Sequence, residues 1–413
     1  MAKGKGKAPE HPLAHRMLLT VTMCLLAAGA VMVYSASSAR DLLAGGGDGT
    51  GYLLRYVGFG ALGVVLMHVL SKRGLDLVRR YTPLLLTLSF VLLLVVLLPG
   101  IGIEVNGANR WIGAGSLSFQ PSELAKLALV LYAAELLGSK RRIRSIRAAA
   151  PVILVAAVMA LLVAVEPDLG TALVIAGTTT ALLVAAGVPL RHLAVAAGIA
   201  AALIAIFALL EPYRRARLTS FIDPWAHAGG TGFQSVQGQI ALGSGGLFGV
   251  GLGQSVQKIF YLPEAHTDFI LAVIGEELGV AGICVLLSLY GMIGYAGLRT
   301  AKAAKGVYAK LLAAGLTSLI LCQALLNVYA VLGLAPLTGV PLPFISSGSS
   351  SLIVLLCAMG LLLNVAQGGH ATLRAVKSRD DDARSKAAED RDRRRRDGGA
   401  RRPGAGNRRR AAG

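Results

Sequence analysis

Long apolar segments alternate with short polar connections along most of this chain. Residues 84–98 and 151–165, for example, contain no charged side chain. In lipid a helix satisfies its own backbone hydrogen bonds, and one span takes about 20 residues. A membrane β-barrel would instead show alternating segments of about 10 residues. The pattern therefore predicts an all-α polytopic membrane protein.

Ten apolar segments qualify as transmembrane helices. They are expected at residues 17–37, 52–70, 82–98, 121–138, 150–166, 169–186, 190–210, 267–296, 310–334 and 344–366. The first is interpreted as an uncleaved span, because its apolar core exceeds that of a signal peptide and further spans follow. A long outer loop, residues 211–266, separates the seventh helix from the eighth and is too long for a passive turn.

Composition agrees with this class. Of the 413 residues, 54% are hydrophobic and 15% are charged, and the mean hydropathy is +0.64. A soluble enzyme of this length would carry far more charge, so that class is excluded. Cys24, Cys284, Cys322 and Cys357 all lie in apolar segments, where buried free thiols are expected rather than a disulfide or a metal site.

Lys and Arg concentrate in every second loop, which places both termini in the cytoplasm. Residues 1–16 are then a basic cytoplasmic N-terminus, 17–366 the ten-span domain, and 367–413 a cytoplasmic tail. The tail is rich in Arg, Asp and Gly and cannot bury a core, so it is expected to be disordered. It contributes much of the net charge of +19. Beside a bilayer, anionic lipid is a better partner for it than nucleic acid.

Ionisable residues at the edges of spans are functional candidates, because burying them in a membrane is costly. The strongest group is residues 262–269, which contains Glu264, His266 and Asp268. A partly dehydrated carboxylate at Asp268 would be a stronger base than one in water. Capping of the following helix explains the same residue equally well. His266 fits an interfacial position better than a ligand role.

A second group combines Arg110 and Trp111 with Glu123 and Lys126. Glu123 and Lys126 are three residues apart and share one helix face. They could simply neutralise each other near the bilayer, or they could shape a polar cavity in which Lys126 or Arg110 holds a phosphate. Trp111 also fits an interfacial aromatic belt.

Two further groups lie on the same predicted outer side. Glu166 and Asp168 place two carboxylates between adjacent spans, where a helix break with an amino-terminal cap is the preferred interpretation. Arg214 and Arg215 follow the seventh span and would attract an anionic headgroup. Together these groups suit either a transporter of an anionic solute or an enzyme acting on a lipid headgroup, and spacing alone leaves both open.

Several motifs in this order resemble the SEDS family of bacterial cell-wall synthesis, represented by FtsW and RodA, over about residues 17–367. They are residues 106–111 (NGANRW), 118–126 (SFQPSELAK), 166–170 (EPDLG), 221–225 (FIDPW), 243–249 (GSGGLFG) and 262–277. One departure is visible at residues 348–351, which read GSSS where the family usually has GGSS. The missing glycine removes a permissive backbone position.

The resemblance implies a ten-span peptidoglycan glycosyltransferase that polymerises lipid II in the bacterial cytoplasmic membrane. It implies that Asp268 is essential and acts as the base, and that Glu123 and Lys126 matter for function. Cations at Lys126, Arg110, Arg214 or Arg215 would meet the leaving diphosphate, together with a divalent ion such as Mg or Mn. Trp111, Glu264 and His266 complete the expected substrate-binding set.

The sequence of residues 263–268 resembles the division branch, FtsW, more than the elongation branch, RodA, and so implies a role at the division septum. The expected partners are then a class B penicillin-binding protein, which is a transpeptidase, and other divisome proteins. The alternatives are a RodA-type elongation polymerase, a lipid II flippase or transporter, and a scaffold.

Overall fold

The computed structural model describes residues 12–43, 49–105, 108–114, 117–139, 146–195, 198, 219–259, 262 and 265–368. Most of the predicted seventh span, the residues Arg214, Arg215 and Glu264, and nearly all of the predicted tail lie outside these ranges. Ten α-helices within them are α1 (Leu13–Leu43), α2 (Gly51–Lys72), α3 (Leu75–Val96), α4 (Pro121–Gly138), α5 (Ile146–Val165), α6 (Leu169–Ala185), α9 (Phe233–Ser244), α10 (Ile270–Ala303), α11 (Val307–Val331) and α12 (Ser349–Ala366).

Seven helices in the described part of the chain are long and apolar enough to cross a membrane. They are residues 13–38 of α1, α2, α3, residues 147–165 of α5, α10, α11 and α12. The fourth and sixth predicted spans coincide with α4 and α6, but α4 carries Glu123, Lys126 and Glu135, and α6 has only 17 residues. The prediction of a polytopic helical membrane protein is therefore confirmed.

Several helices run past the predicted apolar boundaries. Helix α3 begins at Leu75, before the expected position 82, and α10 extends to Ala303 rather than to 296. Charged residues end the apolar segment in both cases, but they do not end the helix, because Arg and Lys have good helix propensity.

The prediction of an all-α fold is wrong in one place. The connection between α3 and α4 forms a three-stranded antiparallel sheet of β1 (Ile103–Val105), β2 (Ala108–Ala114) and β3 (Leu117–Phe119), in the order β1-β2-β3. Strands β1 and β3 have only three residues each, too few to show a periodic pattern. Besides the helices and this sheet, a short 3₁₀ helix, η1 (Trp225–His227), precedes α9.

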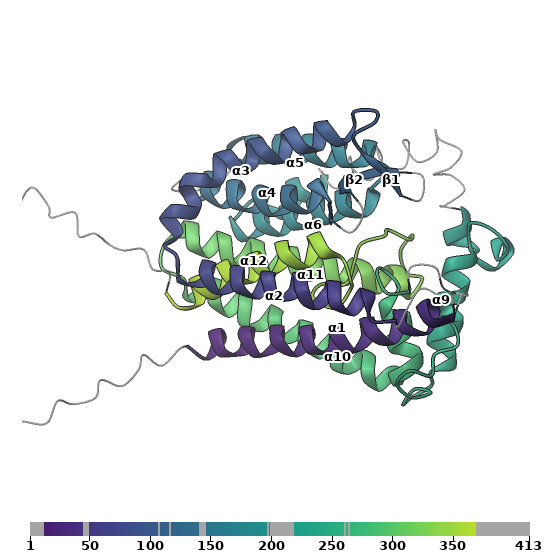
Figure 1. Cartoon of the computed structure of the whole chain (residues 1–413). Coiled ribbons are helices and arrows are strands. Elements are labelled where there is room, and N and C mark those ends of the chain that lie inside the picture. Colours follow the sequence, from purple (N-terminus) through teal and green to yellow (C-terminus); the bar gives the residue numbers. More distant parts are fainter. Residues whose placement is uncertain are drawn as a thin grey trace, which may run out of the picture. The chain divides into compact units, whose positions relative to one another are not determined.

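The helices of residues 12–368 pack in two groups (Figure 1). In one group α12 lies along α2, α1 along α10, and α10 along α11, while α3 to α6 form the other. Helix α11 packs against both α4 and α6 and so joins the two groups. One large cluster of buried apolar side chains runs through this junction.

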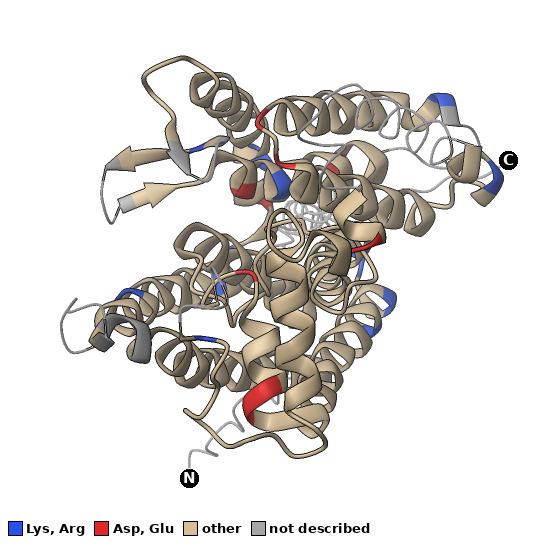
Figure 2. Ribbon diagram, turned by 90° about the vertical axis from the view of Figure 1, so that its right-hand side faces the viewer, with Lys and Arg blue, Asp and Glu red and all other residues tan. Residues whose placement is uncertain are grey.

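The outer surface of the helices is apolar. Leu54, Leu154 and Val285 are 67%, 66% and 61% exposed. In Figure 2 most of the helical ribbon is tan, which marks residues other than Lys, Arg, Asp and Glu. Cys24 and Cys284 are free thiols on this exposed surface, so the expectation that they would be buried is wrong. Helices with apolar surface outside as well as inside the bundle are typical of proteins surrounded by lipid.

One close contact between helices depends on a glycine. A Cβ added at Gly360 of α12 would lie 2.6 Å from the carbonyl oxygen of Met67 and 2.8 Å from its Cα, on α2. We expect Gly360→Val to push these two helices apart and to cost about 1–3 kcal/mol, as overpacking does. Thermal unfolding of the purified protein in detergent measures this loss.

Gly58 on α2 is the matched control, because a Cβ there would meet nothing within 4 Å. Gly58→Val should change stability by no more than about 0.5 kcal/mol. Equal unfolding temperatures for the two variants would contradict the packing argument.

Candidate functional site

Arg110 projects from β2 onto the turn between α5 and α6. Its Nε donates to the backbone carbonyl of Glu166 at 3.0 Å, and its Nη2 donates to the carbonyl of Pro167. The side chain is thus aimed by two carbonyl oxygens, which leaves its positive charge without a carboxylate partner among these contacts. Neighbouring residues of a strand point to opposite faces, so Trp111 faces away from the Arg110 side of the sheet.

Asp168 caps α6, as the sequence predicted. Its Oδ1 accepts from the backbone N–H of Thr171 at 3.0 Å, and its Oδ2 accepts from Nε2 of Gln120 at 3.0 Å. Gln120 also donates its backbone N–H to Oγ of Ser350 at 3.1 Å. One polar chain therefore ties the starts of α4, α6 and α12 together.

Glu166 is a buried carboxyl group in the turn that holds Arg110. Its residue is 1% exposed, and neither carboxylate oxygen has a hydrogen-bond partner among the described residues. Burial raises the pKa of Glu166 to about 8, nearby Asp168 contributes to the rise, and Arg110 opposes it. Burial therefore favours the protonated, uncharged form of this side chain near neutral pH.

Asp268 and Arg110 both approach Gly339, in the loop between α11 and α12. A Cβ at Gly339, which has φ +66°, would lie 3.9 Å from Nη1 of Arg110 and 3.9 Å from Oδ2 of Asp268. At most twice that distance separates the guanidinium from the carboxylate. The structure therefore brings together two predicted site residues that are far apart in the sequence.

The position of Asp268 is set through its backbone. Nδ2 of Asn327, on α11, donates to the carbonyl of Asp268 at 2.7 Å and to the carbonyl of Val340 at 2.8 Å. The N-cap residue of α10 is Phe269, whose side chain cannot cap. A capping side chain is ordinarily found at the N-cap position itself. Asp268 lies one residue before that position.

His266 lies beside α2 near the same loop. Its ring centroid is 4.2 Å from that of Tyr52, and its backbone carbonyl accepts from the backbone N–H and Oγ of Ser347, at 3.1 Å and 2.9 Å. The residue is buried. His266 therefore helps to fix the segment that precedes Asp268.

Glu123 and Lys126 form the predicted ion pair on α4. Nζ of Lys126 lies 2.8 Å from Oε1 of Glu123 and donates to Oε1 of Gln323, on α11, at 2.9 Å. Nε2 of Gln323 in turn donates to Oγ of Ser351 at 3.0 Å and to the carbonyl of Pro341 at 3.1 Å. Both charges are buried, so this pair holds α4, α11 and the Gly339 loop together.

Sequence reasoning did not single out Gln323 and Asn327. They are amide side chains four residues apart in an apolar segment, and therefore on one face of α11. Polar side chains within a membrane span are rare and usually face the protein interior. That spacing was the signal that could have identified them.

Three predicted substrate-binding residues, Arg214, Arg215 and Glu264, lie outside the described residues. Within the described ranges, no group of three or more His, Cys, Asp or Glu side chains is arranged to hold a metal ion. The observed site therefore consists of Arg110, Asp268 and the Gly339 loop, with Glu166 and Asp168 behind Arg110.

Comparison with known proteins decides the family. The family model for FtsW, RodA and SpoVE, described as cell cycle protein, matches residues 15–370. The chain belongs to this family. The resemblance to SEDS proteins is thereby confirmed.

Two curated members of this FtsW/RodA/SpoVE family illustrate the similarity. Stage V sporulation protein E of Bacillus subtilis is 40% identical over 354 residues, which are 85% of this chain and 96% of that protein. A probable peptidoglycan glycosyltransferase FtsW of Trichlorobacter lovleyi is 40% identical over 357 residues, 85% and 93% of the two chains. Equal identity to both means that these two relatives do not separate the division branch from the sporulation branch.

A solved structure of a peptidoglycan synthase complex, described as showing the structural coordination of polymerization and crosslinking, contains a chain with the same fold. That chain is 30% identical to this one, with a TM-score of 0.72. The match covers 88% of this chain and 100% of that one.

The departure from the family motif at Ser349 has no local cost, because Ser349 is the first residue of α12 and needs no special conformation.

Breaking the buried ion pair should destabilise the protein strongly. Lys126→Met leaves Glu123 buried without its cation, which typically costs about 3–5 kcal/mol. The double variant Glu123→Gln/Lys126→Met removes both charges and should recover most of that loss. Thermal unfolding in detergent provides the measurement.

The partly exposed pair of Arg79 and Glu135, 3.7 Å apart, is the control. Arg79→Met should cost less than about 1 kcal/mol, because solvent screens the pair. A double variant of α4 as unstable as Lys126→Met would argue against this electrostatic explanation.

Glu166 should make stability depend on pH. Its pKa is near 4.5 when unfolded and about 8 when folded, so the folded state retains a proton that the unfolded state loses between these values. Stability is then greatest below the unfolded pKa and falls as the pH rises toward 8. Glu166→Gln cannot ionise and should show a flatter profile of unfolding temperature against pH, whereas an unchanged slope would contradict the assignment.

Proposed function

We propose that this chain is a peptidoglycan glycosyltransferase that polymerises lipid II into glycan strands. The names of its relatives suggest the activity. The observation that supports it most directly is the approach of Arg110 and Asp268 to Gly339. This arrangement places a carboxylate and a guanidinium where one substrate could meet both.

Asp268 is the proposed base. A sugar hydroxyl of one lipid-linked chain attacks the anomeric carbon of another, and its proton passes to the carboxylate of Asp268. The new glycosidic bond forms as the bond from the anomeric carbon to the diphosphate oxygen breaks. The lipid diphosphate leaves with that electron pair and gains negative charge.

Arg110 is the proposed partner of the leaving diphosphate. Two backbone carbonyls aim its side chain, so it needs little reorganisation when charge develops. Neutral Glu166 beside it does not cancel its charge. Arg214 and Arg215 are proposed to add positive charge from the outer loop, and Trp111, Glu264 and His266 are proposed as further substrate contacts.

Glu123 and Lys126 are proposed to act mainly by holding the site together. Lys126 is buried, and its charge is matched by Glu123. Through Gln323 the pair reaches the loop that carries Gly339. A divalent cation, Mg or Mn, is also proposed to assist, but the steps above use protein side chains only.

The proposed setting is the bacterial cytoplasmic membrane at the division septum, with ten spans and both termini in the cytoplasm. A class B penicillin-binding protein and other divisome proteins are the proposed partners. The similarity to a chain of a synthase complex that coordinates polymerization and crosslinking supports a transpeptidase partner. The basic tail is proposed to bind anionic lipid.

Replacing the base should abolish polymerisation. We expect purified wild-type protein, assayed with its candidate transpeptidase, to convert lipid II into glycan chains that are resolved on a gel. Asp268→Asn keeps the size of the side chain but cannot accept the proton, so product should fall at least about 100-fold, as expected for loss of a general base.

Asp76→Asn is the matched control, because Asp76 is exposed at the start of α3. Its activity should equal that of the wild type. Normal product from Asp268→Asn would place the base elsewhere, and absence of product from the wild type with its partner would contradict the polymerase assignment.

A further inference from the structure

Helix α10, which follows the proposed base, is broken at Gly279. Gly279 has φ 67° and ψ −166°, which are not helical angles. Residues 270–278 thus form a separate helical segment, roughly 13 Å long at 1.5 Å per residue. Asp268 lies just before its amino end, and Glu276 and Glu277 lie at its carboxyl end.

The outer segment 246–251 replaces the backbone hydrogen bonds lost at this break. In an unbroken helix the N–H groups of Val280 and Ala281 would donate to the carbonyls of Glu276 and Glu277. Instead, those carbonyls accept from the N–H groups of Val250 and Gly251, at 2.9 Å and 3.0 Å. Val280 and Ala281 donate to the carbonyls of residues 246 and 247, both at 3.0 Å.

Glycine is required where these backbones meet. A Cβ at Gly249 would lie 2.1 Å from the carbonyl oxygen of Glu277, and one at Gly279 would lie 2.5 Å from the backbone nitrogen of Gly249. Both glycines also have positive φ. The backbone of the outer segment therefore packs directly against the backbone of the broken helix, in one defined register.

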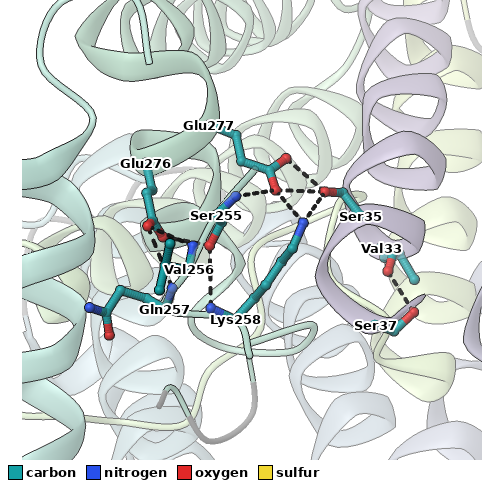
Figure 3. Close-up of polar contacts among 9 residues, drawn as sticks. All are labelled: Val33, Ser35, Ser37, Ser255, Val256, Gln257, Lys258, Glu276 and Glu277. Atoms are coloured by element: carbon teal, nitrogen blue, oxygen red, sulfur yellow. Dashed lines mark hydrogen bonds and ion pairs between the residues drawn. The ribbon is translucent and has the colours of Figure 1, made fainter. Parts of the chain in front are cut away.

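The side chains at the end of the short helix extend this attachment (Figure 3). Oε1 of Glu277 pairs with Nζ of Lys258 at 2.7 Å, and both of its oxygens accept from Oγ of Ser35 at 2.7 Å. Glu276 accepts from Oγ of Ser255 at 2.5 Å and from the backbone N–H of Val256 at 3.0 Å. We call Ser35, Ser255, Lys258, Glu276 and Glu277 the carboxylate clamp.

The carboxylate clamp joins three parts of the chain, and all of its members are buried. Ser35 belongs to α1, Ser255 and Lys258 to the outer segment, and the two glutamates to α10. A buried ion pair adds little net stability, because desolvation of its charges offsets their attraction. The hydrogen-bond donors and acceptors of the carboxylate clamp do, however, allow few alternative orientations of the segments that carry them.

The short helix is consequently held at both ends. Asn327 binds the carbonyl of Asp268 at the amino end, and the carboxylate clamp binds the carboxyl end. We propose that Lys258, Glu276 and Glu277 are positioning residues that orient helix 270–278 and thereby hold Asp268 opposite Arg110. The inference rests on the proposed polymerase function, in which Asp268 is the base.

Neutralising the clamp should reduce turnover rather than substrate binding. The double variant Lys258→Met/Glu277→Gln removes both charges together and so avoids an unpaired buried ion. A displacement of about 1 Å at a reacting group can reduce the rate about 100-fold. We expect kcat for lipid II polymerisation to fall by about that factor, with KM changed less than about threefold.

Hydrogen exchange provides a second readout that does not require activity. The amides of residues 270–278 should exchange at least about 10-fold faster in the double variant, because the short helix has lost its attachment. The amides of α11 should keep their wild-type rates. Lys302→Met is the matched control, since Lys302 is exposed near the end of the same α10, and it should leave both readouts unchanged.

The outcomes separate the two proposals. Wild-type protein without polymerase activity would contradict the proposed function, whereas the exchange result would still test the attachment of the short helix. Normal kcat in the double variant would overturn the positioning role, even if exchange were faster. A rise in KM together with a fall in kcat and in unfolding temperature would overturn it as well, since that pattern indicates a merely structural role.

Discussion

The cost of burying an unpaired charge determines how the polar parts of this protein are arranged. Lys126 and Lys258 are both buried, and each lies against a glutamate, Glu123 and Glu277 respectively. Because an unpaired ion in a dry interior is so costly, each pair compels its helix to face a particular neighbour. Glu166 has no such ion pair among the described contacts, and burial instead raises its pKa and so favours its uncharged form.

These pairs act on the site through neutral groups. Gln323 accepts from Lys126 and donates to the carbonyl of Pro341. Asn327 donates to the carbonyls of Val340 and Asp268. The same loop is held further by two tyrosine hydroxyls of the core, which donate to its backbone carbonyls at 2.5 Å and 2.6 Å: Tyr56 to Phe344 and Tyr290 to Pro343. The loop between α11 and α12, which Arg110 and Asp268 approach at Gly339, is thus fixed by several hydrogen bonds to its backbone.

The acidic residues of this protein fall into two groups, those that hold the structure together and the one proposed to act as the base. Asp168 caps α6 and binds Gln120, so it is committed to structure. Glu276 and Glu277 are likewise occupied by hydroxyl, amide and ammonium donors. Asp268 differs because it is only partly buried and lies just before a short helix, where it and Arg110 both approach Gly339. Position in the fold and partial exposure, rather than residue type, distinguish the proposed base.

The amino-acid sequence by itself determined the class of protein, most helical segments, the Asp168 cap and the pairing of Glu123 with Lys126. These features depend on local spacing and hydropathy, which a linear pattern records directly. Only the tertiary structure decided the small sheet, the break at Gly279, the partners of Lys258 and the meeting of Arg110 with Asp268. Each of these depends on contacts between residues distant in the chain, and periodicity indicates which side of a helix is buried but not which distant segment covers it.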